Sequence, residues 1–191
     1  AAFAWAENRV VRVGVYENAP KVFTSESGKP SGIFIDIIEY IAKQEDWDLE
    51  YVTGTWIEGL DRLDRGEIDL MPDVAFTAER DKKFSFHKIQ VLSSWFQAYA
   101  GKDSGIRSIL DLNGKRIAIL EGSVQQDVFS RFSQGFGLRI ILFLFQHYIT
   151  MFEMAARGEV DAAVTNQFYG AMHARRYGLV DTAVVFEPSA L

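Results

Sequence analysis

A five-residue pattern that occurs twice constrains the fold of this chain more than any other feature. Arg-Gly-Glu-Ile-Asp spans positions 65–69 and Arg-Gly-Glu-Val-Asp spans positions 157–161, an offset of 92 residues (157 − 65). In each copy a helix-stopping glycine precedes a short apolar run, which predicts a helix, a tight turn and a strand. Self-similarity at a long offset predicts two similarly built halves. Polar residues follow each strand, and ligands of open α/β sheets bind at the carboxyl ends of strands.

The composition is that of an ordinary globular protein and excludes several classes of function. The chain has 191 residues, of which 48% are hydrophobic and 24% charged, and its net charge is −6. Such an acidic chain lacks the basic footprint of a nucleic-acid-binding protein. Because it contains no cysteine, it has neither disulfides nor a Cys-ligated zinc site.

Two stretches bear on membranes and export. No apolar run reaches the roughly eighteen residues that a membrane helix needs, and the longest run, at 140–145, is predicted to be a buried strand. Small residues alternate at positions 1–7, as they do at the end of a secretory signal. A cloning remnant would give the same pattern, so both interpretations stay open.

Strands and helices alternate along the chain, which predicts a parallel α/β protein. A capping box of Thr55 and Glu58 marks one helix start, and the aromatic stretch 91–100 is predicted to be an extended crossing between the halves. The strands are expected at 10–16, 49–52, 68–71, 114–120, 139–145, 160–164 and 183–186, and the helices at 33–42, 55–65, 109–112, 125–132, 148–156 and 167–176, with another starting at the Thr-x-Glu-Arg box of 77–80.

A set of motifs occurs in one order along the whole chain. They are Gly28 to Ile37, Trp56 with Gly59-Leu60, and the segments 66–69, 77–80, 84–86, 112–118, 121–123 and 158–162. In this order they resemble the type II periplasmic solute-binding proteins of the amino-acid-binding group, bacterial extracellular solute-binding family 3. The segments 56–73 and 93–96 look most like the sensor-domain branch found in membrane histidine kinases.

The resemblance implies a two-lobed α/β fold with a parallel-rich sheet in each lobe and a hinged cleft between them. On this basis we expect lobe 1 at residues 7–96, lobe 2 at residues 97–182, and the start of the return crossing to lobe 1 at residues 183–191. The closing strand and terminal helix of lobe 1 in this family have no counterpart in the sequence, so a fragment or an unobserved tail is expected.

The resemblance also implies ligand contacts from both lobes. Arg80 matches the family's Arg that grips a ligand carboxylate, since the guanidinium fork fits a carboxylate with two hydrogen bonds. The alternative is a surface Arg paired with Glu79 or Asp81. Ser123 and Val124 begin a helix whose free N–H groups would bind the same carboxylate; Ser123 would also serve as an ordinary N-cap.

The remaining predicted contacts depart from the family pattern or are aromatic. Asp73 and Ala75 lie where the family places small hydroxyl or backbone contacts. Asn166 lies where amino-acid binders usually carry an Asp that pairs with the ligand's ammonium. Either Asp73 supplies that missing anion or the ligand has no amino group. Tyr16 and Trp56 are expected in the aromatic wall of the cleft.

These observations predict an extracytoplasmic sensor domain of a membrane receptor, probing the periplasm for a small polar solute such as an amino acid or carboxylate. The alternative is the soluble binding protein of an amino-acid importer. A dehydratase or wall-cleaving enzyme, for which Glu17 and Asp73 would meet in the cleft, is a third class. We expect no catalytic residue, metal or cofactor, because the three histidines lack metal-ligand spacing. As a sensor the protein would be tethered to the membrane, and a homodimer is one assembly it could adopt.

Overall fold

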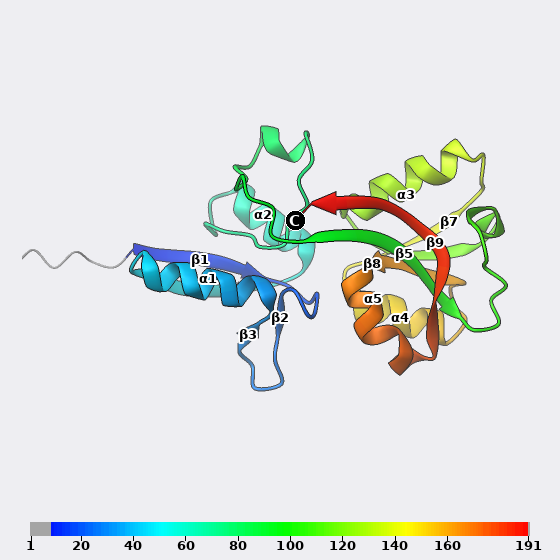
Figure 1. Cartoon of the computed structure of the whole chain (residues 1–191), viewed down its shortest axis with the longest axis horizontal. Helices are drawn as coiled ribbons and strands as arrows, with labels where there is room; N and C mark the ends of the chain where they lie inside the picture. The colour runs from blue at the N-terminus through cyan, green and yellow to red at the C-terminus, as the bar shows by residue number, and fades with distance from the viewer. Residues whose placement is uncertain (1–8, 191) are drawn as a thin grey trace, which may run out of the picture.

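Two sheets, each covered by helices, divide the molecule into two parts joined by long crossing strands (Figure 1). The computed structural model describes residues 9–190, and the side chains of residues 9–187. Lobe 1 here means the part built on the first, two-stranded sheet, and lobe 2 the part built on the five-stranded sheet. The alternating segment at positions 1–7 lies outside the described residues.

Lobe 1 is organised around two parallel strands that pair from Arg9 opposite Trp47 to Val15 opposite Thr53. Val11 and Val13 on the inner face pack against Ile38 of the first helix, because alternate residues of a strand face the same side. The elements are β1 (Arg9–Val15), β2 (Phe23–Thr24), β3 (Pro30–Ser31), α1 (Ile33–Gln44), β4 (Trp47–Thr53), α2 (Trp56–Asp64) and the short helix η1 (Arg80–Lys82).

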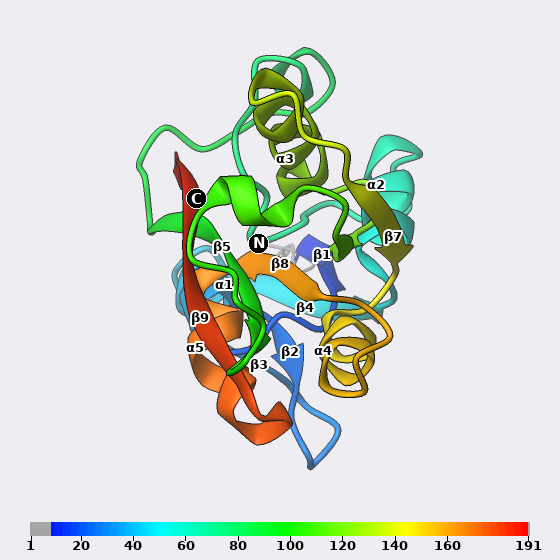
Figure 2. The same ribbon diagram turned by 90° about the vertical axis from the view of Figure 1, so that its right-hand side faces the viewer.

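Lobe 2 is a mixed sheet in the order β7-β6-β8-β5-β9, in which β6 is parallel to β7 and β8, while β5 is antiparallel to β8 and β9. Ile117 and Ile119 of β6 pack with Phe129 of α3, whereas Ala118 packs with Phe152 of α4, so helices cover both faces (Figure 2). The elements are β5 (Ser93–Gly101), η2 (Ile109–Leu112), β6 (Arg116–Leu120), α3 (Val124–Gly135), β7 (Ile141–Phe145), α4 (Tyr148–Ala156), β8 (Ala162–Asn166), α5 (Gln167–His173), η3 (Ala174–Tyr177) and β9 (Leu179–Ala190).

The two copies of the repeated pattern make equivalent hydrogen bonds in the two lobes, which confirms the prediction of two similarly built halves. In lobe 1, Arg12 on β1 donates from its backbone N–H and its Nε to Asp69, and from its terminal nitrogen to the carbonyl of Gly66. In lobe 2, Arg116 on β6 makes the same three bonds to Asp161 and to the carbonyl of Gly158. Each copy thus joins the end of a helix to a parallel strand of its own sheet, β1 in lobe 1 and β6 in lobe 2.

Two predicted elements after the first copy are shorter than expected. The strand predicted at 68–71 is wrong: only Leu70 bridges to Val13, because Pro72 lacks a backbone donor and Asp73 takes a left-handed conformation (φ 61°). The helix predicted after the Thr-x-Glu-Arg box is a single 3-10 turn, η1, with no buried residue to hold a longer helix in place.

Other differences concern exposure and length. The run at 140–145 forms β7 at the edge of the sheet, so Ile141 and Leu144 are 52% and 46% exposed and the expectation of a buried strand is wrong. The strand predicted at 160–164 runs from 162 to 166, which places Asn166 at its carboxyl end. The last strand is longer than predicted and pairs with β5 from Leu179 to Ala190. The lobe boundaries at 96/97 and 182/183 stay a prediction.

The length and composition of the helices bear on whether any of them could cross a membrane. Within residues 9–190, none of the helices combines the length and the apolar character needed to cross a bilayer.

Candidate functional site

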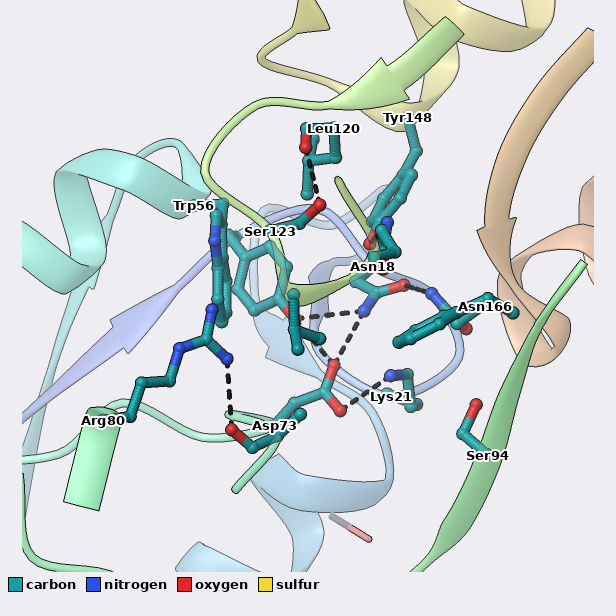
Figure 3. Close-up of a pocket in the computed structure, with 15 residues that line it drawn as sticks. Asn18, Lys21, Trp56, Asp73, Arg80, Ser94, Leu120, Ser123, Tyr148 and Asn166 are labelled. Atoms are coloured by element: carbon teal, nitrogen blue, oxygen red, sulfur yellow. Dashed lines mark hydrogen bonds and ion pairs between the residues drawn. The ribbon is translucent and has the colours of Figure 1, made fainter. Parts of the chain in front are cut away.

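All eight residues predicted to contact a ligand line one cavity between the lobes. They come from six places in the sequence: Tyr16, Trp56, Asp73 with Ala75, Arg80, Ser123 with Val124, and Asn166. The cavity has a volume of about 30 Å³, which is room for roughly two water molecules. The fold therefore brings the predicted residues together in a nearly closed cleft (Figure 3).

Asp73 is the centre of a buried hydrogen-bond network. Its carboxylate accepts from the Tyr16 hydroxyl, the Asn18 amide and the Lys21 ammonium, each over 2.7 Å. The side chains of Lys21 and Asp73 are 4% and 0% exposed. A buried carboxylate is stable when it is paired and hydrogen-bonded in this way. Asp73 faces the cleft as predicted, but its charge is already matched by Lys21 (Figure 3).

Lys21 was missed by the sequence analysis, because lysine is rarely buried and the surrounding loop has no periodic pattern. The start of α1 fixes its backbone: Ile33 donates to the carbonyl of Pro20, and Phe34 donates to the carbonyl of Lys21. Gly32, with φ 121°, has no room for a Cβ, which would lie 2.5 Å from the Lys21 carbonyl oxygen. This close approach of the backbone requires a glycine at position 32.

Asn166 connects the two lobes across the cleft. It is the N-cap of α5, where its side-chain oxygen accepts from the backbone N–H of Tyr169. Its amide nitrogen donates to the side-chain oxygen of Asn18 over 3.0 Å. Asn18 in turn donates to Asp73, so a chain of three polar side chains runs from lobe 2 to the carboxylate of lobe 1.

Arg80 is half-buried and lies over the Trp56 ring, with its guanidinium carbon 5.3 Å from the ring centroid. One terminal nitrogen donates to the carbonyl of Ala75 over 3.1 Å. Within residues 9–190 it forms no ion pair, so the alternative of a surface Arg paired with Glu79 or Asp81 is wrong. Burial lowers the pKa of Arg80 from its ordinary value, yet a guanidinium stays charged at any physiological pH. The cleft therefore presents a cation with no carboxylate in ion-pair contact among residues 9–190, while the charges of Asp127 and Glu79 act on it from a greater distance.

The amino end of α3 faces Arg80 from lobe 2. Ser123 is its N-cap, accepting from the backbone N–H of Gln126 and donating to the carbonyl of Leu120. Trp56 of lobe 1 donates its indole N–H to the carbonyl of Gly122 over 3.1 Å. The positive end of a helix therefore closes onto the same space as the guanidinium, which is a favourable place for an anion.

Two buried tyrosines are held as neutral hydroxyl groups. Burial, and then the charge of Asp73, raises the pKa of Tyr16 well above its ordinary value. Burial also raises the pKa of Tyr148 to about 12. Tyr148 accepts from the Gln125 amide over 2.9 Å, which leaves its own hydroxyl proton to donate.

The acid–base pair considered for an enzyme is not assembled. Glu17 is exposed and accepts from the backbone N–H of Thr24, whereas Asp73 is bonded to Lys21. The part of the chain that the structure describes holds no cluster of three His, Cys, Asp or Glu side chains that would bind a metal ion.

Known proteins are similar to this chain in sequence. The sequence profile of the bacterial extracellular solute-binding proteins, family 3, matches residues 11–126. The amino-acid-binding protein AabA of Dichelobacter nodosus is 28% identical over 164 residues, which are 84% of this chain and 63% of AabA. The chain therefore spans less than two thirds of this curated relative.

Solved structures with similar folds cover almost the whole chain. The Gly52Ala mutant of arginine-bound ArgBP from T. maritima superposes with a TM-score of 0.85 at 23% identity, covering 95% of this chain and 85% of ArgBP. A histidine kinase sensor domain with similarity to periplasmic binding proteins superposes with a TM-score of 0.84 at 21% identity, covering 95% of this chain and 80% of that domain. At these identities the likeness shows the fold alone, a two-lobed periplasmic-binding-protein architecture.

Proposed function

Since this chain belongs to the bacterial extracellular solute-binding proteins of family 3, we propose that it is the extracytoplasmic ligand-binding domain of a membrane signalling receptor. Its cleft binds a small solute that carries a carboxylate, and the two lobes close on that solute. The observation that carries this proposal is Arg80, a half-buried cation without an ion-pair partner among residues 9–190, facing the amino end of α3.

The contacts across the cleft support binding by closure. Trp56 and Asn18 of lobe 1 bond to Gly122 and Asn166 of lobe 2, and an apolar cluster that includes residues of both lobes adds to these polar contacts. A ligand bound to both lobes replaces or adds to such contacts and thereby favours the closed arrangement.

The sensor role is preferred over the importer role on two grounds. The segments 56–73 and 93–96 resemble the sensor branch, and one structural neighbour is named as a histidine kinase sensor domain. The importer alternative is supported by the name of AabA, an amino-acid-binding protein. The coding sequence after residue 191 distinguishes the two: a membrane helix followed by a kinase domain supports the sensor, and a stop codon after the closing part of lobe 1 supports the importer.

A thermal-shift screen tests whether the cleft takes carboxylates. The panel contains amino acids, small organic acids and polyamines. A compound at 100 times its Kd stabilises the native state by about 2.7 kcal/mol, which raises the melting temperature of a domain of this size by roughly 5 °C or more. We expect hits among compounds with a carboxylate. Stabilisation by polyamines but by no carboxylate would contradict the proposal.

A further inference from the structure

We propose that the Lys21–Asp73 pair makes the cleft selective for carboxylates that have no amino group. This inference rests on the proposed function, since it specifies the ligand class of the same cleft. It starts from the charges that line the cavity, which among the described residues are Lys21, Asp73 and Arg80. Their sum is one positive charge, so the complementary ligand is a monoanion rather than a zwitterion.

The side-chain oxygens of Asp73, Asn18 and Asn166, three of the acceptors that line the cavity, already accept hydrogen bonds from the protein. Asp73 accepts from Lys21 with one carboxylate oxygen and from Tyr16 and Asn18 with the other. The side-chain oxygens of Asn18 and Asn166 accept from Asn166 and from the backbone of Tyr169. An incoming ammonium group would therefore have to displace Lys21 from the one carboxylate that lines the described cavity.

The hydrogen-bond donors that line the cavity, by contrast, have N–H and O–H groups that no hydrogen bond among the described residues uses. Arg80 uses one of its five N–H groups on the carbonyl of Ala75, and Lys21 uses one of its three on Asp73. Tyr148 also has a hydroxyl proton to give. Cations and donors with spare capacity select acceptors, so we expect one carboxylate on Arg80 and a second, uncharged acceptor, such as a hydroxyl or oxo oxygen, near Lys21.

Calorimetry with matched compounds tests this selectivity. Each pair has the same carbon skeleton and one carboxylate, and the amino group is either absent or replaced by a hydroxyl: butanoate with 2-aminobutanoate, and 2-hydroxypropanoate with alanine. A desolvated ammonium without a counterion weakens binding by at least about thirtyfold. We therefore expect the wild-type protein to prefer the amino-free member of at least one pair by that factor.

Two variants of the pair locate the cause. In Lys21→Met, Asp73 is left free for a ligand ammonium, so the preference should shift toward the amino acid. In Lys21→Met combined with Asp73→Asn, neither charge remains, and the preference for the amino-free acid should return. If removal of the buried partner prevents Lys21→Met from folding, Asn166→Asp gives the same readout. It keeps an N-cap residue on α5, adds an anion from lobe 2, and should likewise shift the preference toward amino acids.

The outcomes separate this inference from the proposed function. Preference of the wild-type protein for the amino-free acids, lost in Lys21→Met or Asn166→Asp, supports the inference. Equal or tighter binding of the amino acids overturns it and leaves the carboxylate cleft standing. Binding of neither class overturns the proposed function together with the inference.

Discussion

Two aspartates at matched positions of the repeat each hold the turn after a helix against a neighbouring strand. Asp69 and Asp161 each accept from the backbone and the side chain of an arginine on a parallel strand of their own sheet, β1 or β6. The sequence pattern predicted the turn and the start of a strand. It did not identify Arg12 and Arg116 as the partners, because these residues lie 57 and 45 positions away from the aspartates.

The titration of Asp69 follows from this contact. Hydrogen bonds from the side chain and then the backbone of Arg12 lower the pKa of Asp69 to about 2, from an ordinary 3.8. The folded pKa is the lower one, so the stabilisation is complete above the ordinary value and is lost as pH falls toward 2. We expect Arg12→Gln to raise this pKa toward 3.8, measured by carboxyl carbon NMR shifts against pH. Arg116→Gln is the control, and an equal shift of Asp69 in that variant would contradict the assignment.

The residues of the site could be predicted only where the surrounding sequence indicated the end of a strand or the start of a helix. Arg80, Ser123 and Asn166 follow a strand or begin a helix, and the resemblance placed each of them at the cleft. Lys21 and Asn18 lie in a loop without periodicity, and nothing in a single sequence indicates that a lysine there is 3% exposed. Their position depends on the start of α1, which is a tertiary contact.

At the scale of elements, apolar periodicity predicted where the helices occur better than it predicted which of their residues are buried. In α4 the apolar positions at helical spacing, 148, 151, 152 and 155, are all buried. In α1 the apolar positions at the same spacing include Ile37 and Ile41, which instead line an open apolar groove of about 440 Å³ on lobe 1. Periodicity indicates which side of a helix is apolar, whereas burial depends on what covers that side.

The packing of α5 on β5 gives a prediction at this scale. Gly170 lies against the Tyr99 ring, and a Cβ at this position would overlap the ring. We expect Gly170→Ala to lower the free energy of unfolding by up to about 2 kcal/mol, because overpacking costs about 1–3 kcal/mol and the helix-propensity gain of about 1 kcal/mol offsets only part of that cost. Urea denaturation measures the change.

Gly135 provides the matched control for that substitution. It ends α3, and a Cβ there would meet nothing within 4 Å. Gly135→Ala should leave stability unchanged or raise it by up to about 1 kcal/mol. A stabilised Gly170→Ala variant would show that α5 does not pack on Tyr99 as described.

The whole molecule joins the two halves only at the crossing strands and around the cleft. β5 and β9 run side by side between the lobes (Figure 1). The remaining bonds at the cavity are few, and among them the indole of Trp56 and the amide of Asn166 each reach the opposite lobe. This arrangement permits hinge motion about the crossing, which the resemblance implied and composition alone could not have indicated.

The central claim is that Arg80 holds a ligand carboxylate between the lobes. Calorimetric titration of Arg80→Gln with the carboxylate found in the screen tests it most directly. The exposed Lys83→Gln variant, which lies three positions along the chain and removes the same charge, is the matched control. We predict that Arg80→Gln weakens binding by at least about thirtyfold, while Lys83→Gln changes it by about twofold or less. Equal affinities of the wild-type protein and Arg80→Gln would contradict the account.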